Sequence, residues 1–194
     1  MKKLILNSFA ICLPLGVAII FIYSFTYLAI QQYIRLSANE ILVQYAENTK
    51  EKLEKGVTIS QAISGIELTD MQKSLSPFVI IYDKMGTVQA STTTLHGTAP
   101  TLSAGVFANA LQNWENRRTW QPEHNVRNAI VVLPYALPGQ EGYVVAGRSL
   151  REIEKRKQFL KIQIEIAIIV TLTATFLITL IVQASRNRST QTPK

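Results

Sequence analysis

Few side chains capable of catalysis or metal binding are present in this sequence of 194 residues. A single cysteine, Cys12, lies in an apolar run, which excludes an internal disulfide, a cysteine-based zinc site and a cysteine protease. The two histidines, His96 and His124, stand 28 positions apart, without the i, i+4 spacing of a helical zinc pair. A Gly-x-Ser-x-Gly motif and a glycine-rich phosphate loop are also missing. The sequence therefore predicts no enzyme, no metal site and no cofactor.

Charged residues are scarce, at 17% of the chain, whereas apolar residues make up 47%. The net charge of +7 arises largely at the ends, where all charged residues are basic: Lys2, Lys3, Arg186, Arg188 and Lys194. Residues 31–161 are nearly balanced, with fifteen basic and twelve acidic residues. A nucleic-acid-binding protein would concentrate positive charge on its folded domain, so nucleic acid is excluded as a partner.

Two long segments lack formal charge. Residues 9–30 would form a helix about 33 Å long and residues 166–184 one of about 28 Å, at about 1.5 Å per residue. A hydrocarbon core is about 30 Å thick, so we expect transmembrane helices at residues 9–30 and 162–185. Lys2 and Lys3 also fit a cleaved signal peptide, but residues 9–30 exceed a signal h-region of about 7–15 residues and no Ala-x-Ala-like site follows.

The basic tails predict the orientation in the cell membrane. Two spans leave both tails, residues 1–8 and 186–194, on one side, and the positive-inside rule assigns that side to the cytoplasm. Residues 31–161 are then extracytoplasmic. The short second tail leaves no room for a cytoplasmic domain, so we expect any output to lie on a partner.

The second span carries hydroxyl groups. Its four threonines can each bond the carbonyl oxygen four residues earlier, or can lie at a contact between helices; the residues are Thr171, Thr173, Thr175 and Thr179. The sequence leaves both alternatives open.

The segment between the spans predicts a single α+β domain with an antiparallel sheet. Residues 31–55 favour a helix that Gly56 ends, and a short helix follows at 58–66. Residues 78–82 are apolar at every position, which is typical of a central strand buried on both faces. The remaining expected elements are a turn at 83–86, a strand at 87–91, a loop at 92–105, a helix at 105–113 and strands at 117–121, 126–137 and 142–148. In the helix, Val106 and Ala110 are expected to face inward, together with Phe107 and Leu111.

A last helix runs from the domain into the second span. Its less polar positions recur at three and four residues: Leu150, Ile153, Lys157, Leu160 and Ile164. This seam predicts either packing on the first helix of the same chain or a homodimer contact. A basic cluster, residues 155–157, fits either anionic lipid headgroups or a solvated face with Glu152 and Glu154.

In order and position, these elements resemble the extracytoplasmic PAS-like or single-Cache sensor domains of bacterial two-component kinases and chemoreceptors. The segments SPFVIIYDKMG and GYVVAGRSLREIEKR are similar to the first strand and turn and to the last strand and exit helix of that family. The resemblance covers residues 30–185. It implies a PAS-like sheet and a sensory role, although the family usually continues into a kinase or signalling domain.

Four residues are candidates for binding a small anionic ligand. Arg127 and Arg148 fall near one end of the expected sheet, where their guanidinium groups could bind a carboxylate or phosphate. Tyr82 and Trp120 could form the apolar walls of such a pocket. The alternative is structural: Arg127 pairs with Glu123, Arg148 pairs with Glu152, and Trp120 belongs to the core.

The sequence thus predicts a non-catalytic sensory or ligand-binding protein that acts through its membrane helices, as a homodimer or with a signalling partner. The alternative function is a structural or accessory subunit of a membrane complex that binds no small ligand. A closed pocket at Arg127 and Arg148 would favour sensing, and a filled core with an exposed apolar patch would favour the accessory subunit.

Overall fold

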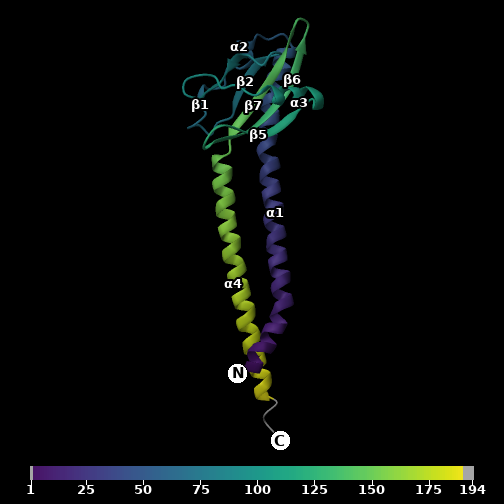
Figure 1. Ribbon diagram of the computed structural model, residues 1–194, viewed down its shortest axis with the longest axis vertical. Helices are drawn as coiled ribbons and strands as arrows, with labels where there is room; N and C mark the ends of the chain where they lie inside the picture. The colour runs from purple at the N-terminus through teal and green to yellow at the C-terminus, as the bar shows by residue number, and fades with distance from the viewer. Residues whose placement is uncertain (1, 190–194) are drawn as a thin grey trace. The chain divides into compact units, whose positions relative to one another are not determined.

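The chain is mixed α and β, with a long helix at each end (Figure 1). The computed structural model describes the backbone of residues 2–189 and the side chains of residues 8–37 and 39–186. Its elements are α1 (Lys2–Glu54), α2 (Ile59–Ala62), β1 (Thr69–Asp70), β2 (Phe78–Asp83), β3 (Val88–Ser91), β4 (Thr93–Thr94), α3 (Ala104–Asn113), β5 (Asn116–Glu123), β6 (Val126–Leu137), β7 (Gln140–Ser149) and α4 (Arg151–Ser189). The predicted α+β class is confirmed.

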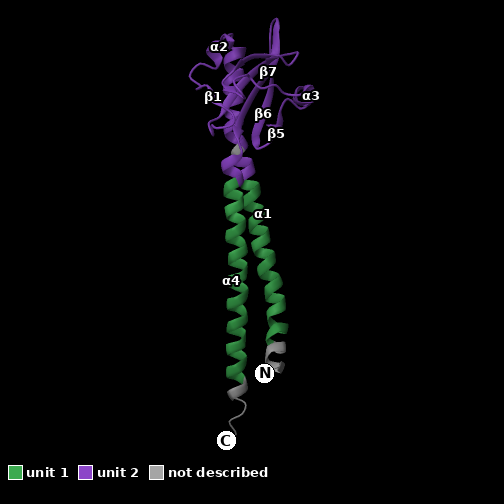
Figure 2. Cartoon of the chain, turned by 60° about the vertical axis from the view of Figure 1, so that its left-hand side comes forward, with its two compact units in different colours: residues 1–33, 155–194 green, residues 34–154 purple. Residues whose placement is uncertain are grey.

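The chain divides into two compact units (Figure 2). Residues 34–154 form one unit, which lies inside the predicted domain of 31–161, and residues 1–33 and 155–194 form the other, whose described part is helical. The outer ends of the two predicted tails, residue 1 and residues 190–194, lie outside the described residues.

The sheet of the unit formed by residues 34–154 has five antiparallel strands in the order β3-β2-β7-β6-β5. Strand β2 is an inner strand, between β3 and β7, and its residues 78–82 are all buried, as the continuous apolar run predicts. Strands β6 and β7 pair over ten residues each and are joined by Pro138-Gly139, where Gly139 takes a φ of 83°. The turn after β2 is also confirmed, because the Asp83 carboxylate accepts hydrogen bonds from the backbone N–H groups of Met85 and Thr87.

The two faces of the sheet carry separate cores. On one face, α3 contributes Val106, Phe107 and Ala110, and the Phe107 ring lies 5.0 Å from Tyr82 and 4.7 Å from Tyr143 between ring centroids. On the other face, the domain part of α1 and the short α2 cover β2, β6 and β7. Both faces are therefore buried, which is why residues 78–82 of β2 and 143–146 of β7 are continuous apolar runs.

The ends of the helices follow local signals. Helix α1 ends before Gly56, whose φ of 81° and N–H bond to the Leu53 carbonyl oxygen (2.8 Å) make it the predicted cap. Helix α2 is shorter than the predicted 58–66, and Thr58 caps it by accepting from the Gln61 N–H. In α3, Leu111 is 62% exposed, so the prediction that it faces inward is wrong.

The small parallel pair β1 and β4 was not expected. Thr93 and Thr94 lie in the predicted loop of 92–105, whereas no element was predicted at Thr69 and Asp70, which pair with them across more than twenty positions of chain. Pairing at such a distance leaves no local periodicity to detect.

Helices α1 and α4 each contain a segment long and apolar enough to cross a membrane. Within the helical unit, Ser8 donates to Gln183 (2.9 Å), the Cys12 thiol to the Thr179 hydroxyl (3.3 Å), and the Tyr23 and Thr171 hydroxyls lie 3.3 Å apart. All four threonines also bond the carbonyl oxygen four residues earlier. Thr171 and Thr179 therefore satisfy both alternatives at once.

The seam on α4 is half-buried at each of its five positions. Leu150 packs against the core that α1 shares with the sheet, in agreement with the intrachain alternative. A homodimer contact along the seam stays a prediction.

Candidate functional site

A cavity of about 430 Å³ lies where the turn between β5 and β6 meets the first turn of α4. We call it the junction cavity; its lining residues are Gln121, His124, Asn125, Arg127, Arg151 and Glu154. Asn125 holds the tight turn with a left-handed φ of 66°, a conformation that asparagine tolerates better than most residues. The cavity includes one of the four predicted ligand residues, Arg127.

Strand β6 is fastened to the start of α4 by backbone and side-chain bonds. The Leu150 N–H donates to the Arg127 carbonyl oxygen (2.8 Å), and the Arg127 guanidinium forms an ion pair with Glu154 through Nη1. The predicted partner of Arg127 was Glu123, so that pairing is wrong: Glu154 is distant in sequence but adjacent once α4 begins beside β6.

Arg151, which sequence reasoning missed, adds a second guanidinium to the cavity. It donates to the carbonyl oxygens of Gln72 (3.2 Å) and Lys73 (2.8 Å), and so also fixes the start of α4 to the turn after β1. Its backbone N–H donates to the Ser149 hydroxyl (3.3 Å). A serine two residues before a helical arginine was the available signal, but it indicates only a helix start.

The charged side chains that line the junction cavity carry a net positive charge. Two guanidinium groups face one carboxylate, Glu154, and a guanidinium carries five N–H donors, more than these contacts use. Arginine binds carboxylate and phosphate through paired N–H donors, so the junction cavity has the chemistry to accept a small anion.

The remaining predicted ligand residues lie elsewhere. Arg148 is on the α1 face of the sheet, in register with Ala129, and its Nε donates to the Leu75 carbonyl oxygen (3.1 Å) and not to Glu152. Tyr82 and Trp120 belong to the opposite, α3 face: Tyr82 is fully buried and donates to the Pro100 carbonyl oxygen (2.8 Å), and Trp120 packs against that core. The structure therefore does not bring the four residues together around one pocket.

A polar cluster fixes the loop before α3 to the end of β5. His96 and Glu123 are 2.6 Å apart between Nε2 and Oε2, and Gln72 donates to the other Glu123 oxygen at 2.6 Å. The hydrogen bond from His96 lowers the pKa of the Glu123 carboxyl below its usual value, and the bond from Gln72 adds to this effect. The sequence predicted a solvated His96; its side chain is 65% exposed, but it has a partner.

Among the described side chains, no group of three His, Cys, Asp or Glu residues is close enough to hold a metal ion. A comparison of the sequence with protein-family models and with characterised proteins finds no match.

Proposed function

We propose that this chain is a two-span membrane protein whose central domain lies outside the cytoplasm, binds a small anion in the junction cavity, and transmits binding through α4. Two apolar helices support the membrane location. The basic residues beside both spans support cytoplasmic ends through the positive-inside rule. The proposed role is sensory and non-catalytic.

The order of elements supports a PAS-like assignment of the domain. A long helix and a short one precede a hairpin, a loop with a helix, three antiparallel strands and an exit helix, as in the sensor domains that the sequence resembles. This likeness concerns architecture, so the function rests on the site.

The observation that carries the proposal is the position of the junction cavity at the start of α4. Arg127 from β6 and Arg151 from α4 line the same space, and Glu154 of α4 pairs with Arg127. An anion that draws donors from both arginines would compete with Glu154 for Arg127. Binding would thereby change the contacts that hold the first turn of α4, and α4 continues without interruption into the apolar segment.

One observation favours the alternative, an accessory subunit without a small ligand. Both sheet faces are filled cores, and the end of α3 exposes two large apolar side chains, Leu111 (62%) and Trp114 (76%). Exposed aromatic and aliphatic residues of this kind are common at protein contacts.

The test measures ligand binding and its transmission in the full chain, reconstituted in lipid nanodiscs. The melting temperature is recorded with acetate, succinate and inorganic phosphate, for the wild type, Arg127→Ala and, as the matched control, Arg118→Ala, an exposed arginine on β5 outside the cavity. A ligand at 100 times its dissociation constant adds about 2.7 kcal/mol of stability. We expect a shift that Arg127→Ala abolishes and Arg118→Ala retains.

Transmission is read at Cys12, whose thiol contacts Thr179 of α4. The rate of its alkylation by a membrane-permeant maleimide should change when the anion binds. Binding without any change in this rate would contradict transmission through α4, and the absence of any anion response would favour the accessory subunit.

A further inference from the structure

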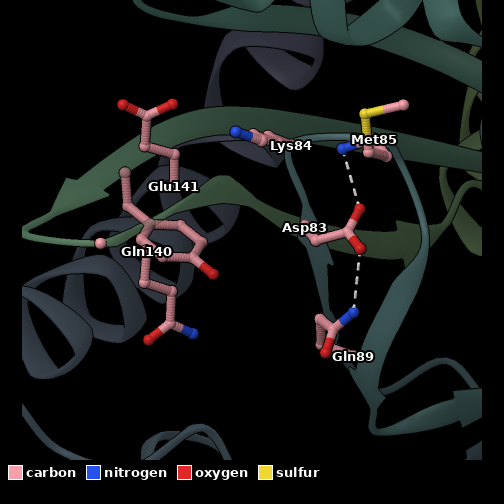
Figure 3. A pocket seen from close by; sticks show the side chains of 8 residues that line it. Asp83, Lys84, Met85, Gln89, Gln140 and Glu141 are labelled. Atoms are coloured by element: carbon pink, nitrogen blue, oxygen red, sulfur yellow. Dashed lines mark hydrogen bonds between the residues drawn. The ribbon is translucent and has the colours of Figure 1, made fainter.

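A second cavity, of about 470 Å³, lies at the opposite end of β7 from the junction cavity, between the turn after β2 and the hairpin of β6 and β7. We call it the turn cavity. Figure 3 shows its labelled side chains: Asp83, Lys84, Met85 and Gln89 come from the β2–β3 hairpin, and Gln140 and Glu141 come from the start of β7. None of the four ligand residues expected from the sequence lines it.

Tyr135 gives this cavity a buried polar group. The side chain lines the cavity, is only 3% exposed, and its hydroxyl has no hydrogen-bond partner of good geometry among the described residues. Most buried polar side-chain atoms in proteins are hydrogen-bonded, so an unpaired hydroxyl at a cavity requires an explanation. A bound molecule that pairs with it would provide one.

The ring of Tyr135 lies against Gly142, its partner across the hairpin, in space that is open because glycine has no side chain. A Cβ atom on Gly142 would lie 2.9 Å from both Cε1 and the hydroxyl oxygen of Tyr135. The absence of a side chain at Gly142 therefore leaves room for the buried ring and hydroxyl of Tyr135. The exposed Gln140 side chain interacts with this hydroxyl, although not with hydrogen-bond geometry, and a ligand donor would compete with it.

The charges around this hydroxyl favour a cation. Asp83 accepts backbone N–H bonds from Met85 and Thr87 at Oδ1 and a bond from Gln89 at Oδ2 (3.1 Å), and the Thr87 hydroxyl also interacts with this carboxylate, so Asp83 contributes mainly its negative charge. Glu141 supplies a second carboxylate and Lys84 one opposing positive charge. Burial raises the pKa of the Tyr135 hydroxyl, Gln140 lowers it, and the negative charge of Asp83 raises it, with a net increase. The hydroxyl therefore stays protonated, and its oxygen can accept a hydrogen bond from a ligand.

We propose that the turn cavity binds a small organic cation with a primary ammonium group, which donates to the Tyr135 hydroxyl and is attracted by the carboxylates of Asp83 and Glu141. An ammonium has three donors, which suits two or three separate acceptors. A metal ion fits less well, because the lining includes the Met85 thioether and an aromatic ring, and because no three potential ligands converge among the described side chains.

This site is independent of the proposed anion binding. The two cavities share no lining residue, so either site can exist without the other.

The experiment titrates the full chain in nanodiscs with 1,4-diaminobutane, and with 1,4-butanediol and magnesium chloride as controls for shape and charge. Binding is followed by calorimetry for the wild type, Tyr135→Phe, Glu141→Gln and, as the control, Arg118→Ala. Tyr135→Phe retains the ring over Gly142 and removes only the hydroxyl. We expect it to keep the wild-type melting temperature or raise it, because an unpaired buried group is lost.

The expected result is saturable binding of the diamine and not of the diol or magnesium. Affinity should fall about tenfold or more in Tyr135→Phe, as for a hydrogen bond to a charged group, and several-fold in Glu141→Gln. Arg118→Ala, at an exposed residue of β5 that lines neither cavity, should bind as the wild type does. Equal binding of the diol or magnesium, no binding of the diamine, or unchanged affinity in either cavity variant would overturn the proposal.

Discussion

The hydroxyl of Tyr82 provides the sharpest test of the fold, because a residue expected to line a ligand pocket proves to hold a loop. It is fully buried and donates to the carbonyl oxygen of Pro100, in the segment that joins β4 to α3. Burial raises the pKa of Tyr82, so the hydroxyl remains a donor across the accessible pH range.

Tyr82→Phe removes this bond and preserves the ring contact with Phe107. A buried hydrogen bond contributes about 0.5–1.5 kcal/mol, and leaving a buried acceptor unpaired costs about 1–3 kcal/mol. Pro100 is itself buried, so water does not readily replace the lost donor. We expect the variant to lose about 1–3 kcal/mol of unfolding free energy.

The assay is urea unfolding of the full chain in detergent micelles, followed by the fluorescence of Trp120, which packs against the same core. A Trp114→Phe background removes the signal of a side chain that is 76% exposed. Tyr143→Phe is the matched control, because the Tyr143 ring also packs on Phe107 but its hydroxyl makes no hydrogen bond within the described part of the chain. Unchanged stability in Tyr82→Phe, or an equal loss in both variants, would refute this reasoning.

Two further predictions concern packing and pH. Gly147→Ala would place a Cβ atom 2.3 Å from Cζ of Phe78, so we expect about 1–3 kcal/mol of destabilisation in the same urea assay, whereas Gly105→Ala, with no neighbouring atom within 4 Å, should be neutral or stabilising. The Thr87 N–H lowers the pKa of Asp83 from its usual 3.8, and His96 lowers the pKa of Glu123 from its usual 4.5. Each carboxylate therefore stabilises the folded state above its usual pKa, and this contribution is lost as the pH falls through the lowered pKa of the folded state. The melting temperature should therefore fall below about pH 4.5, and a Glu123→Gln variant that falls as steeply as the wild type would contradict the role of that carboxylate.

Much of the fold was predictable because its signals are local. Uncharged segments of membrane length give the two helices, and five consecutive apolar residues give the buried inner strand β2. Asp83 and Gly56 mark a turn and a helix end through chemistry that extends over only two to four residues.

Local sequence patterns were less informative about which side of a helix or strand is buried. Leu111 continues the helical periodicity of Phe107, but α3 buries only Val106, Phe107 and Ala110, and Leu111 is exposed. The sequence likewise predicted strands at β5, β6 and β7. It did not give their register, which decides whether residues of two different strands lie on the same face of the sheet.

The sequence by itself determined the class of the protein: two apolar helices around an α+β domain, with few residues suited to catalysis. Only the tertiary structure decided which polar groups meet. It separated Tyr82 and Trp120 from Arg127, joined Arg127 to Glu154, and left the Tyr135 hydroxyl unpaired at a cavity. The physical reason is that burial and helix spacing are written in neighbouring residues, whereas an ion pair or a cavity depends on strand register and on contacts between segments far apart in the chain.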